Sequence, residues 1–302
     1  MKQLLKRRTQ QLFDLLADRV AQQLADPLSK ADRVAQIQLV LQYQALLQNQ
    51  APLPSFADVE FSATSQNGED GILLFLFTLI GTTNKRVVEI CAGDGIECNA
   101  ANLILNHGWE GLLFDGKETA VKRGQTFYQQ RTNAWRLRRL PPKLVHAWIE
   151  PATINELVAQ HGMTGPIDLL SLDMDGVDYW VWQALDVVVP RLVVLEYNNR
   201  WPADRSVTVP NSKDFVAIEA DTEGEGYFGA SLAAFNKLAR QKGYRLIGAN
   251  SPNTNAFFLQ NGIADDLFPE VSVASCLSSD YARYHQARKV AMGGDKRPLI
   301  EI

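Results

Sequence analysis

The chain has few residues of the kinds that build metal–thiolate sites or disulfide frameworks. Three of its 302 residues are cysteine (Cys91, Cys98 and Cys276), and four are histidine. No Cys-x-x-Cys pair or His/Cys ligand spacing connects them, which argues against a zinc site or a disulfide-stabilised fold. The scarcity of cysteine favours a reducing compartment, and we expect a cytoplasmic protein.

Long apolar runs are also missing. The longest, residues 71–81 (GILLFLFTLIG), is shorter than the roughly 20 residues that a transmembrane helix needs. The basic N-terminus lacks the continuous apolar stretch of a signal peptide. Internal repeats and low-complexity tracts are absent as well, so neither a membrane span nor a solenoid is expected.

Charge of one sign does not dominate. The chain has 30 basic and 34 acidic residues, a net charge of -4, so it has no overall field that would attract nucleic acid. Within residues 122–143, however, seven basic residues occur without an acid. A solvated basic face is the plain interpretation, and a surface for an anionic substrate or a polyanion is the alternative. Trp135 alone among these arginines is a weak indication of nucleic-acid binding.

The hydrophobic content, 46%, and the length suit one large α/β domain with an appendage. We predict that the appendage is a helical extension over residues 1–55. Helical periodicity covers residues 1–26, Pro27 interrupts it, and a second helix is expected over 30–48. The inward side chains predicted for that helix are Val34, Ile37, Leu39, Val40 and Leu46. The apolar stripe is expected to pack on the main domain or on a second subunit, giving a homo-oligomer, and a membrane-surface helix is the alternative.

From residue 56 to residue 302, apolar runs alternate with helical segments. The predicted strands are 86–91, 111–115, 143–149, 167–173, 190–196, 244–249 and 255–260. The predicted helices are 97–107, 117–130, 152–161, 178–186, 231–243 and 277–291, with a further helix near residue 69 that Ser65 or Asn67 would cap. This alternation predicts a parallel sheet covered on both faces, and the last two strands are close enough to form a hairpin. Residues 198–226 show no clear periodicity.

The first predicted strand leads into a tight loop, Cys91-Ala92-Gly93-Asp94-Gly95. Gly93 and Gly95 allow the backbone to approach a ligand closely, and the next helix would begin at the ligand crevice. About 20 residues further on, Asp115 ends the second strand, where a carboxylate can accept hydrogen bonds from both ribose hydroxyls.

Two nucleotide cofactors suit this arrangement. NAD-binding folds use Gly-x-Gly-x-x-Gly and the same downstream acid, but here Cys98 stands at the third glycine position. Glu89, on the first strand, would repel a pyrophosphate, whereas S-adenosylmethionine (SAM) has no phosphate and carries a cationic amino-acid end. The charges therefore favour SAM. An NAD-linked enzyme and a strand–turn–helix with incidental glycines stay open.

Eight segments form a more specific set than the glycine loop alone. They are SQNGEDGIL (65–73), VVEICAGDGIECNAANLIL (87–105), GWEGLLFDG (108–116), DLLSLDMDGVDYWVW (168–182), LVVLEYN (192–198), YFGASLAAF (227–235), GYRLIG (243–248) and NAFFL (255–259). Together they resemble the FkbM-like methyltransferases and their uncharacterised bacterial relatives, from about residue 61 to residue 260.

The resemblance implies a seven-stranded Rossmann-like methyltransferase sheet, mostly parallel with a C-terminal antiparallel hairpin, and SAM as the methyl donor. Glu89, Gly93 and Gly95 would line the amino-acid end of SAM, and Asp115 would hold the ribose. Residues 146–149 would flank the adenine, with Trp148 as a wall. The other residues assigned to the cofactor site are Ser65, Cys91, Ala92, Gly116, Ala147 and Asp173. Cys91 departs from the pattern, since such families often have glycine there.

The fourth and fifth predicted strands end in carboxylates, which we assign to the reaction. Strand ends of an open α/β sheet point into the ligand crevice, so Asp173, Asp175 and Glu196 are the candidate catalytic residues. Asp173 or Asp175 would act as a general base. Alternatively, Asp173 and Glu196 would hold Mg²⁺, which acidifies a bound hydroxyl. Asp178 is expected to cap the following helix.

The sequence therefore predicts a SAM-dependent O- or N-methyltransferase, with O-methylation of a small molecule or a glycan hydroxyl as the preferred reaction. The carboxylates and the lack of a basic field favour such an acceptor over nucleic acid. A non-catalytic SAM-fold protein that binds partners through its N-terminal helices is the alternative from another functional class.

Overall fold

The structure is a computed structural model, and it describes residues 32–132, 141–212, 215–218, 226–291 and 297–302. The chain divides into two compact units, residues 1–53 and residues 54–302. No described helix is both long and apolar enough to cross a membrane.

In the first unit, a helix covers residues 32–48. Gln36 and Tyr43, seven residues apart and therefore on one face, are its buried side chains. Val34 and Ile37, which the sequence analysis placed inward, are 57% and 47% exposed, so that prediction was wrong for these two residues. The error was one of phase, because they lie on the face opposite to Tyr43. The predicted helix over residues 1–26 lies outside the described residues.

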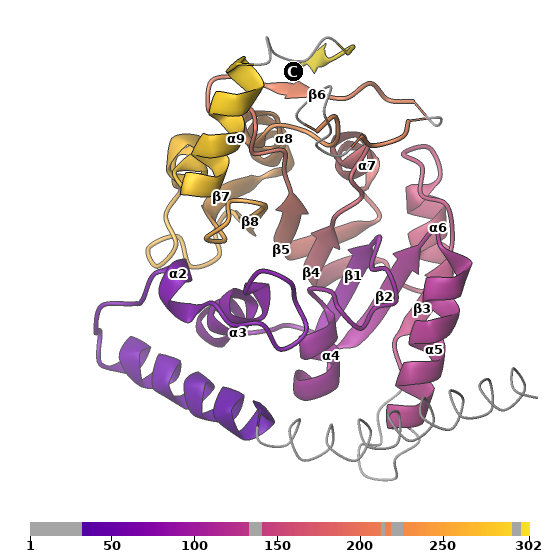
Figure 1. Cartoon of the computed structure of the whole chain (residues 1–302). Coiled ribbons are helices and arrows are strands. Elements are labelled where there is room, and N and C mark those ends of the chain that lie inside the picture. The colour runs from indigo at the N-terminus through magenta and orange to yellow at the C-terminus, as the bar shows by residue number, and fades with distance from the viewer. Residues whose placement is uncertain (1–31, 133–140, 213–214, 219–225, 292–296) are drawn as a thin grey trace, which may run out of the picture. The chain divides into compact units, whose positions relative to one another are not determined.

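The second unit is built on a seven-stranded sheet in the order β3-β2-β1-β4-β5-β8-β7 (Figure 1). Strands β1 to β5 run parallel to one another, whereas β8 is antiparallel to β5 and forms a hairpin with β7. The strands are β1 (Arg86–Ile90), β2 (Glu110–Asp115), β3 (Lys143–His146), β4 (Gly165–Leu172), β5 (Val188–Glu196), β7 (Tyr244–Ala249) and β8 (Asn255–Gln260). The predicted fold, a mostly parallel Rossmann-like sheet that ends in an antiparallel hairpin, is confirmed.

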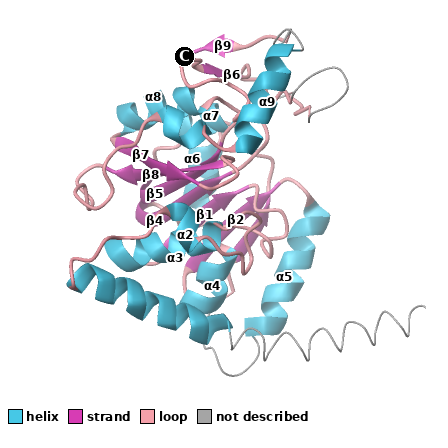
Figure 2. Ribbon diagram, turned by 60° about the vertical axis from the view of Figure 1, so that its left-hand side comes forward, coloured by secondary structure: helices cyan, strands magenta, loops and turns pink. Residues whose placement is uncertain are grey.

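Helices cover both faces of this sheet (Figure 2). The described helices of this unit are α2 (Phe56–Val59), α3 (Glu69–Ile80), α4 (Ala101–His107), α5 (Glu118–Thr132), α6 (Ile154–Gln160), α7 (Asp178–Ala184), α8 (Leu232–Lys242) and α9 (Asp280–Ala291), with a 3-10 helix at Val273–Leu277. Side chains of α6, α7 and α8 and the sheet residues below them form one apolar core, in which Trp182 and Phe235 are among the largest fully buried side chains. The Ser231 cap and the Gly243 terminus of α8 are as the sequence predicts.

Several boundaries differ from the sequence prediction. The helix predicted from residue 97 begins at Ala101, because Glu89 accepts the backbone N–H groups of Asn99 and Ala100 and holds the chain in a turn there. Strand β3 ends at His146 and not at residue 149. Residues 198–226, which lack periodicity, contain the short strand β6 (Val207–Thr208), and this strand pairs with β9 (Ile300–Glu301).

At the amino end of the sheet, Asp168 of β4 holds the turn that leads into β1. Its fully buried carboxylate accepts the N–H groups of Thr83, Asn84 and Lys85 at 2.7–2.9 Å and pairs with Arg191 at 3.0 Å. Burial alone would raise the pKa of this carboxyl, but the hydrogen bonds outweigh burial and lower the pKa. The charge is therefore compensated, and this end of the strand is firmly anchored.

Candidate functional site

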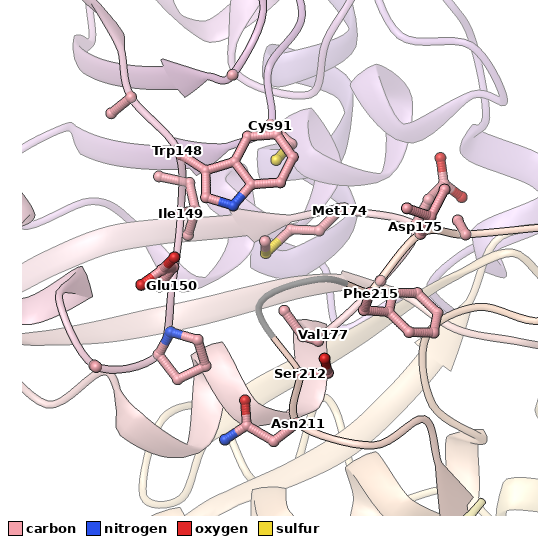
Figure 3. Close-up of a pocket in the computed structure, with 17 residues that line it drawn as sticks. Cys91, Trp148, Ile149, Glu150, Met174, Asp175, Val177, Asn211, Ser212 and Phe215 are labelled. Carbon is pink, nitrogen blue, oxygen red and sulfur yellow. The ribbon is translucent and has the colours of Figure 1, made fainter. Parts of the chain in front are cut away.

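A cavity of about 430 Å³ lies at the carboxyl ends of the parallel strands (Figure 3). Its lining includes Cys91 after β1, Gly116 after β2, Ala147 and Trp148 after β3, and Met174–Val177 after β4; the remaining lining residues are 149–152, 211, 212 and 215–217. Open α/β sheets bind ligands at this edge, and the volume is in the range of small-molecule sites. Among the predicted cofactor residues, Cys91, Gly116, Ala147 and Trp148 line the cavity.

The loop after β1 has an unusual backbone at Cys91. The φ angle of Cys91 is +62°, in the left-handed region that favours glycine, so this position has a backbone geometry that glycine would adopt more easily. The Cys91 thiol is part of the cavity lining, but it is not expected to be reactive. Burial, together with the surrounding carboxylates of Asp178, Asp115, Asp173 and Asp175, raises its pKa, and the group stays protonated.

Gly93 and Gly95 have different roles, although the sequence analysis gave both of them the task of approaching a ligand. A Cβ atom on Gly93 (φ +60°) would meet nothing within 4 Å, so open space adjoins it. A Cβ atom on Gly95 (φ +68°) would lie 2.8 Å from Leu113 Cδ1. The Gly95 carbonyl also accepts a hydrogen bond from the Tyr128 hydroxyl. Close packing on the protein, rather than on a ligand, therefore explains Gly95.

Asp115, at the end of β2, stands beside Gly93. Its Oδ2 accepts the Gly93 N–H at 2.8 Å, and its Oδ1 accepts the Lys117 N–H at 2.7 Å. Because each carboxylate oxygen has two lone pairs, both oxygens can accept one further hydrogen bond. The side chain is half-buried, and although Asp115 does not itself line the cavity, its chain neighbour Gly116 does.

Two predicted cofactor residues are buried in the scaffold instead. The Glu89 carboxylate is 5% exposed and is used by the N–H groups of Asn99 and Ala100 and the hydroxyl of Ser171. Ser65 is also buried, and its hydroxyl accepts the Asp70 N–H in the first turn of α3. Neither residue lines the cavity, and neither does Ala92, whose N–H is bonded to β2. They hold the loop and the start of α3 in place.

Trp148 lies at the cavity with 68% of its surface exposed, and it lines the wall on the β3 side (Figure 3). Its ring comes within 3.1 Å of the point where a Cβ atom on Gly116 would lie, so any larger residue at 116 would displace the indole. An exposed aromatic ring beside an apolar cavity is suited to stacking on a flat ligand.

The three predicted catalytic carboxylates come together, although Asp175 lines the cavity and Asp173 and Glu196 do not. Asp173, Asp175 and Glu196 each offer an oxygen, and these oxygens all lie within 4.8 Å of one another. Asp175, which lines the cavity, has φ +52°. None of the three forms an ion pair with a lysine or arginine of the described segments. The cluster is therefore a negative region without a compensating cation from those segments.

Asp173 and Glu196 share a hydrogen bond between their carboxyl groups. Asp173 keeps solvent contact inside the cleft, but confinement by the protein and the neighbouring carboxylates raise its pKa to about 7. The same causes raise the pKa of Glu196. Two carboxyls this close cannot both ionise easily, so the pair retains one proton near neutral pH and can exchange it with a bound group.

The sequence predicts that Asp178 caps the following helix, but the N-cap position of α7 is Val177 and no side chain caps the helix there. Asp178 instead holds the loop that precedes α7. Its carboxylate accepts the N–H groups of Met174 and Gly176 at 2.7 and 2.9 Å and so fixes the loop that carries Asp173 and Asp175. It is buried, and burial raises its pKa to about 6 despite these hydrogen bonds.

The cavity wall formed by residues 211, 212 and 215–217 was not predicted from the sequence, and neither was the lining role of Met174 and Val177. The wall lies in the stretch without periodicity, and spacing alone gives no indication of where such a segment folds back. Met174 and Val177 were within reach of the analysis, because they flank the predicted catalytic aspartates on a loop that must face the crevice.

Comparisons with known proteins give fold-level likenesses only. A scan against protein-family models finds no match, and a search of curated proteins finds none either. Among solved structures, the chain is similar to magnesium protoporphyrin IX methyltransferase from Synechocystis PCC 6803 with bound SAM (12% identity, TM-score 0.40), covering 64% of this chain and 78% of that one. A SAM-dependent methyltransferase from Clostridium acetobutylicum ATCC 824 has 9% identity and TM-score 0.42, with 64% and 91% covered. The SAH-bound N-terminal domain of EvdMO1 has 14% identity and TM-score 0.40, with 63% and 79% covered.

Proposed function

We propose that this chain is a SAM-dependent methyltransferase. The observation that carries the proposal is the set of groups found along the carboxyl ends of the strands. They are the Asp115 carboxylate, which can accept hydrogen bonds from a diol, the apolar cavity with the exposed Trp148 indole, and the carboxylate cluster that has no cationic partner among the described residues. These groups match the ribose, the adenine and the cationic end of SAM in that order. A dinucleotide would bring a pyrophosphate to the carboxylates, which would repel it.

We assign the cofactor contacts accordingly. Asp115 accepts hydrogen bonds from the ribose hydroxyls, and Gly116, Ala147 and Trp148 surround the adenine. Gly93 offers open backbone to the amino-acid end. Cys91 borders the same site. Glu89, Gly95, Ser65 and Ala92 support the loop from within the protein, which changes the roles that the sequence predicts for them.

Bound SAM supplies a methyl group on a positively charged sulfur. We propose O-methylation, in which the Asp173–Glu196 pair takes up the proton that the acceptor hydroxyl loses as the bond to the methyl forms. The pair suits this task because its raised pKa lies near neutrality, where a general base is most effective. Asp175 and Asp178 act on this base through their charges and through the loop geometry. A small molecule or a glycan hydroxyl is the proposed acceptor, because the carboxylates would repel an anionic one.

A divalent cation is the alternative use of the same carboxylates. Oxygen ligands are those that Mg²⁺ takes in proteins, and Asp173 and Glu196, with Asp175 beside them, would hold it. Chelation separates the two mechanisms. If activity survives EDTA at an unchanged rate, the proton-accepting pair is supported, and loss of activity that Mg²⁺ restores supports the metal.

The finer assignments are also proposals. We infer membership of the FkbM-like group from the eight motifs, a cytoplasmic location from the cysteine content, and a role for residues 1–55 in packing or oligomerisation beside a methyltransferase domain of residues 56–302. Light scattering of the full chain and of a chain starting at residue 54 tests the last point, since equal oligomeric states would remove residues 1–53 from any assembly role.

Thermal unfolding with different ligands tests the proposed function. A ligand at about 100 times its Kd raises the unfolding free energy by about 2.7 kcal/mol. We expect SAM and S-adenosylhomocysteine (SAH) to raise the melting temperature and NAD to leave it unchanged. A shift with NAD alone would replace the proposal with an NAD-linked enzyme. Tight SAM binding without methyl transfer to any acceptor class would indicate the non-catalytic alternative.

A further inference from the structure

One wall of the cavity does not belong to the seven-stranded sheet. Asn211, Ser212 and Phe215 are on this wall, which follows strand β6 in the chain, and Phe215 lies near Val177 of the loop after β4 (Figure 3). A Cβ atom on Gly176 would lie 3.4 Å from the Phe215 ring, which places that ring directly against the catalytic loop. What holds Phe215 in place therefore determines the shape of the cavity.

The base of this wall is secured by short backbone pairings. Val207 and Thr208 of β6 pair with Glu301 and Ile300 of β9, and Thr208 also forms a bridge with Ala230. The chain on both sides of β6 is thus tied to segments far away in sequence. These pairings end before Phe215, so the position of the ring depends on a further contact.

Tyr227 supplies that contact. Its ring centroid is 5.4 Å from that of Phe215, and its backbone exchanges hydrogen bonds of 2.7 and 3.1 Å with Ile218, three residues beyond Phe215. On the other side, its hydroxyl donates to the Pro298 carbonyl at 2.5 Å, and the Arg297 guanidinium lies 4.9 Å from its ring. Tyr227 does not line the cavity, but it connects the Phe215 wall to the segment that leads into β9.

We propose that Tyr227 is a positioning residue for the cofactor pocket, which holds Phe215 against Gly176 so that the wall closes over the nucleoside of SAM. The proposal rests on the proposed function for the identity of the ligand. The hydroxyl bond to Pro298 fixes the tilt of the Tyr227 ring, and the ring contact transmits that tilt to Phe215. A hydrogen bond of a residue that does not line the cavity would then influence affinity without touching the ligand.

A matched pair of variants tests this role. Tyr227→Phe removes the hydroxyl bond to Pro298 and keeps the ring. Tyr244→Phe removes an equivalent bond from a tyrosine hydroxyl to the Pro190 carbonyl, on strand β7 and away from the cavity. Calorimetric titration with SAH should give a Kd about three- to tenfold higher for Tyr227→Phe and an unchanged Kd for Tyr244→Phe, with both melting temperatures lowered.

A double-variant cycle then distinguishes positioning from general loosening. If Tyr227 acts through Phe215, Phe215→Leu with Tyr227→Phe should bind SAH no more weakly than Phe215→Leu alone. Additive losses, or equal Kd values for Tyr227→Phe and the wild type, would overturn the positioning role. Failure of the wild type to bind SAH would instead overturn the proposed function, so the two failures are distinguishable.

Discussion

Asp168, within strand β4 near the amino edge of the sheet, and Asp173, just after the carboxyl end of β4, lie in opposite electrostatic settings. At the amino end, Asp168 has Arg191 and three backbone N–H groups as partners, and its pKa is lowered. At the carboxyl end, five residues along the chain, Asp173 faces other carboxylates, and its pKa is raised to about 7. The first arrangement stabilises the fold, whereas the second reduces stability, as we expect if the carboxylates have the proposed catalytic role. Asp168 therefore belongs to the scaffold, and Asp173 to the proposed site.

The largest effect is expected at the amino end. Asp168→Ala would leave Arg191 and the N–H groups of residues 83–85 without their buried acceptor, and breaking such a buried pair costs about 3–5 kcal/mol of unfolding free energy. Urea denaturation of the variant and the wild type measures this difference. A loss below about 1 kcal/mol, the size of one ordinary hydrogen bond, would show that Asp168 is not an anchor.

At the carboxyl end, we expect activity rather than stability to be lost. Asp173→Asn should lower turnover by about 10²- to 10⁴-fold, the usual contribution of a general base. Its unfolding free energy at pH 7 should equal or exceed that of the wild type, because one charge leaves a repulsive cluster. SAH release with an acceptor found by screening sugars and phenols gives the rate, and urea denaturation gives the stability. A variant with wild-type turnover, or one as unstable as Asp168→Ala, would contradict the claim that Asp173 serves activity rather than stability.

The glycine loop allows the same distinction between scaffold and site to be drawn over two residues. Alanine at either position must adopt a left-handed φ, which costs about 1–2 kcal/mol of unfolding free energy. Gly95→Ala adds a steric clash, because its Cβ atom would lie 2.8 Å from Leu113, whereas the Cβ atom of Gly93→Ala would contact nothing within 4 Å. We therefore expect the larger loss of unfolding free energy for Gly95→Ala and the larger loss of SAH affinity for Gly93→Ala. The reverse order in either measurement would contradict the assigned roles.

The smallest effect concerns the pH dependence of stability. The folded pKa of Asp173 lies above the unfolded value of about 3.9, so the folded state holds more protons between the two values, and stability should fall as pH rises from about 4 to 7. The pH dependence due to Asp168 has the opposite sign, because the contribution of Asp168 to the unfolding free energy is lost as pH falls through its lowered pKa. Asp173→Asn should flatten the fall between pH 4 and pH 7. An unchanged slope would place the titration in another group.

Much of the fold was predictable because local patterns determine it. The alternation of apolar runs with helices predicts the parallel strands, and Ser231 and Gly243 mark the ends of α8. Proximity in sequence predicts the β7–β8 hairpin. Asp115, Asp173 and Glu196 could be placed at one edge because parallel strands all end there.

The roles of Glu89 and Gly95 could not be predicted, since a buried carboxylate and a crowded glycine depend on neighbours distant in sequence. The same holds for the wall around Phe215 and for the phase of the helix over 32–48.

The most direct test of the central claim is a calorimetric titration of SAH into the wild type and Asp115→Asn, with Asp168→Asn as a control from the other end of the sheet. The account predicts that the wild type binds SAH and that Asp115→Asn loses about 10- to 100-fold in affinity, since hydrogen bonds to a charged acceptor contribute about 1.5–3 kcal/mol. Folded Asp168→Asn should bind as the wild type does. Equal affinities for the wild type and Asp115→Asn, or no SAH binding by the wild type, would contradict a SAM site at this edge.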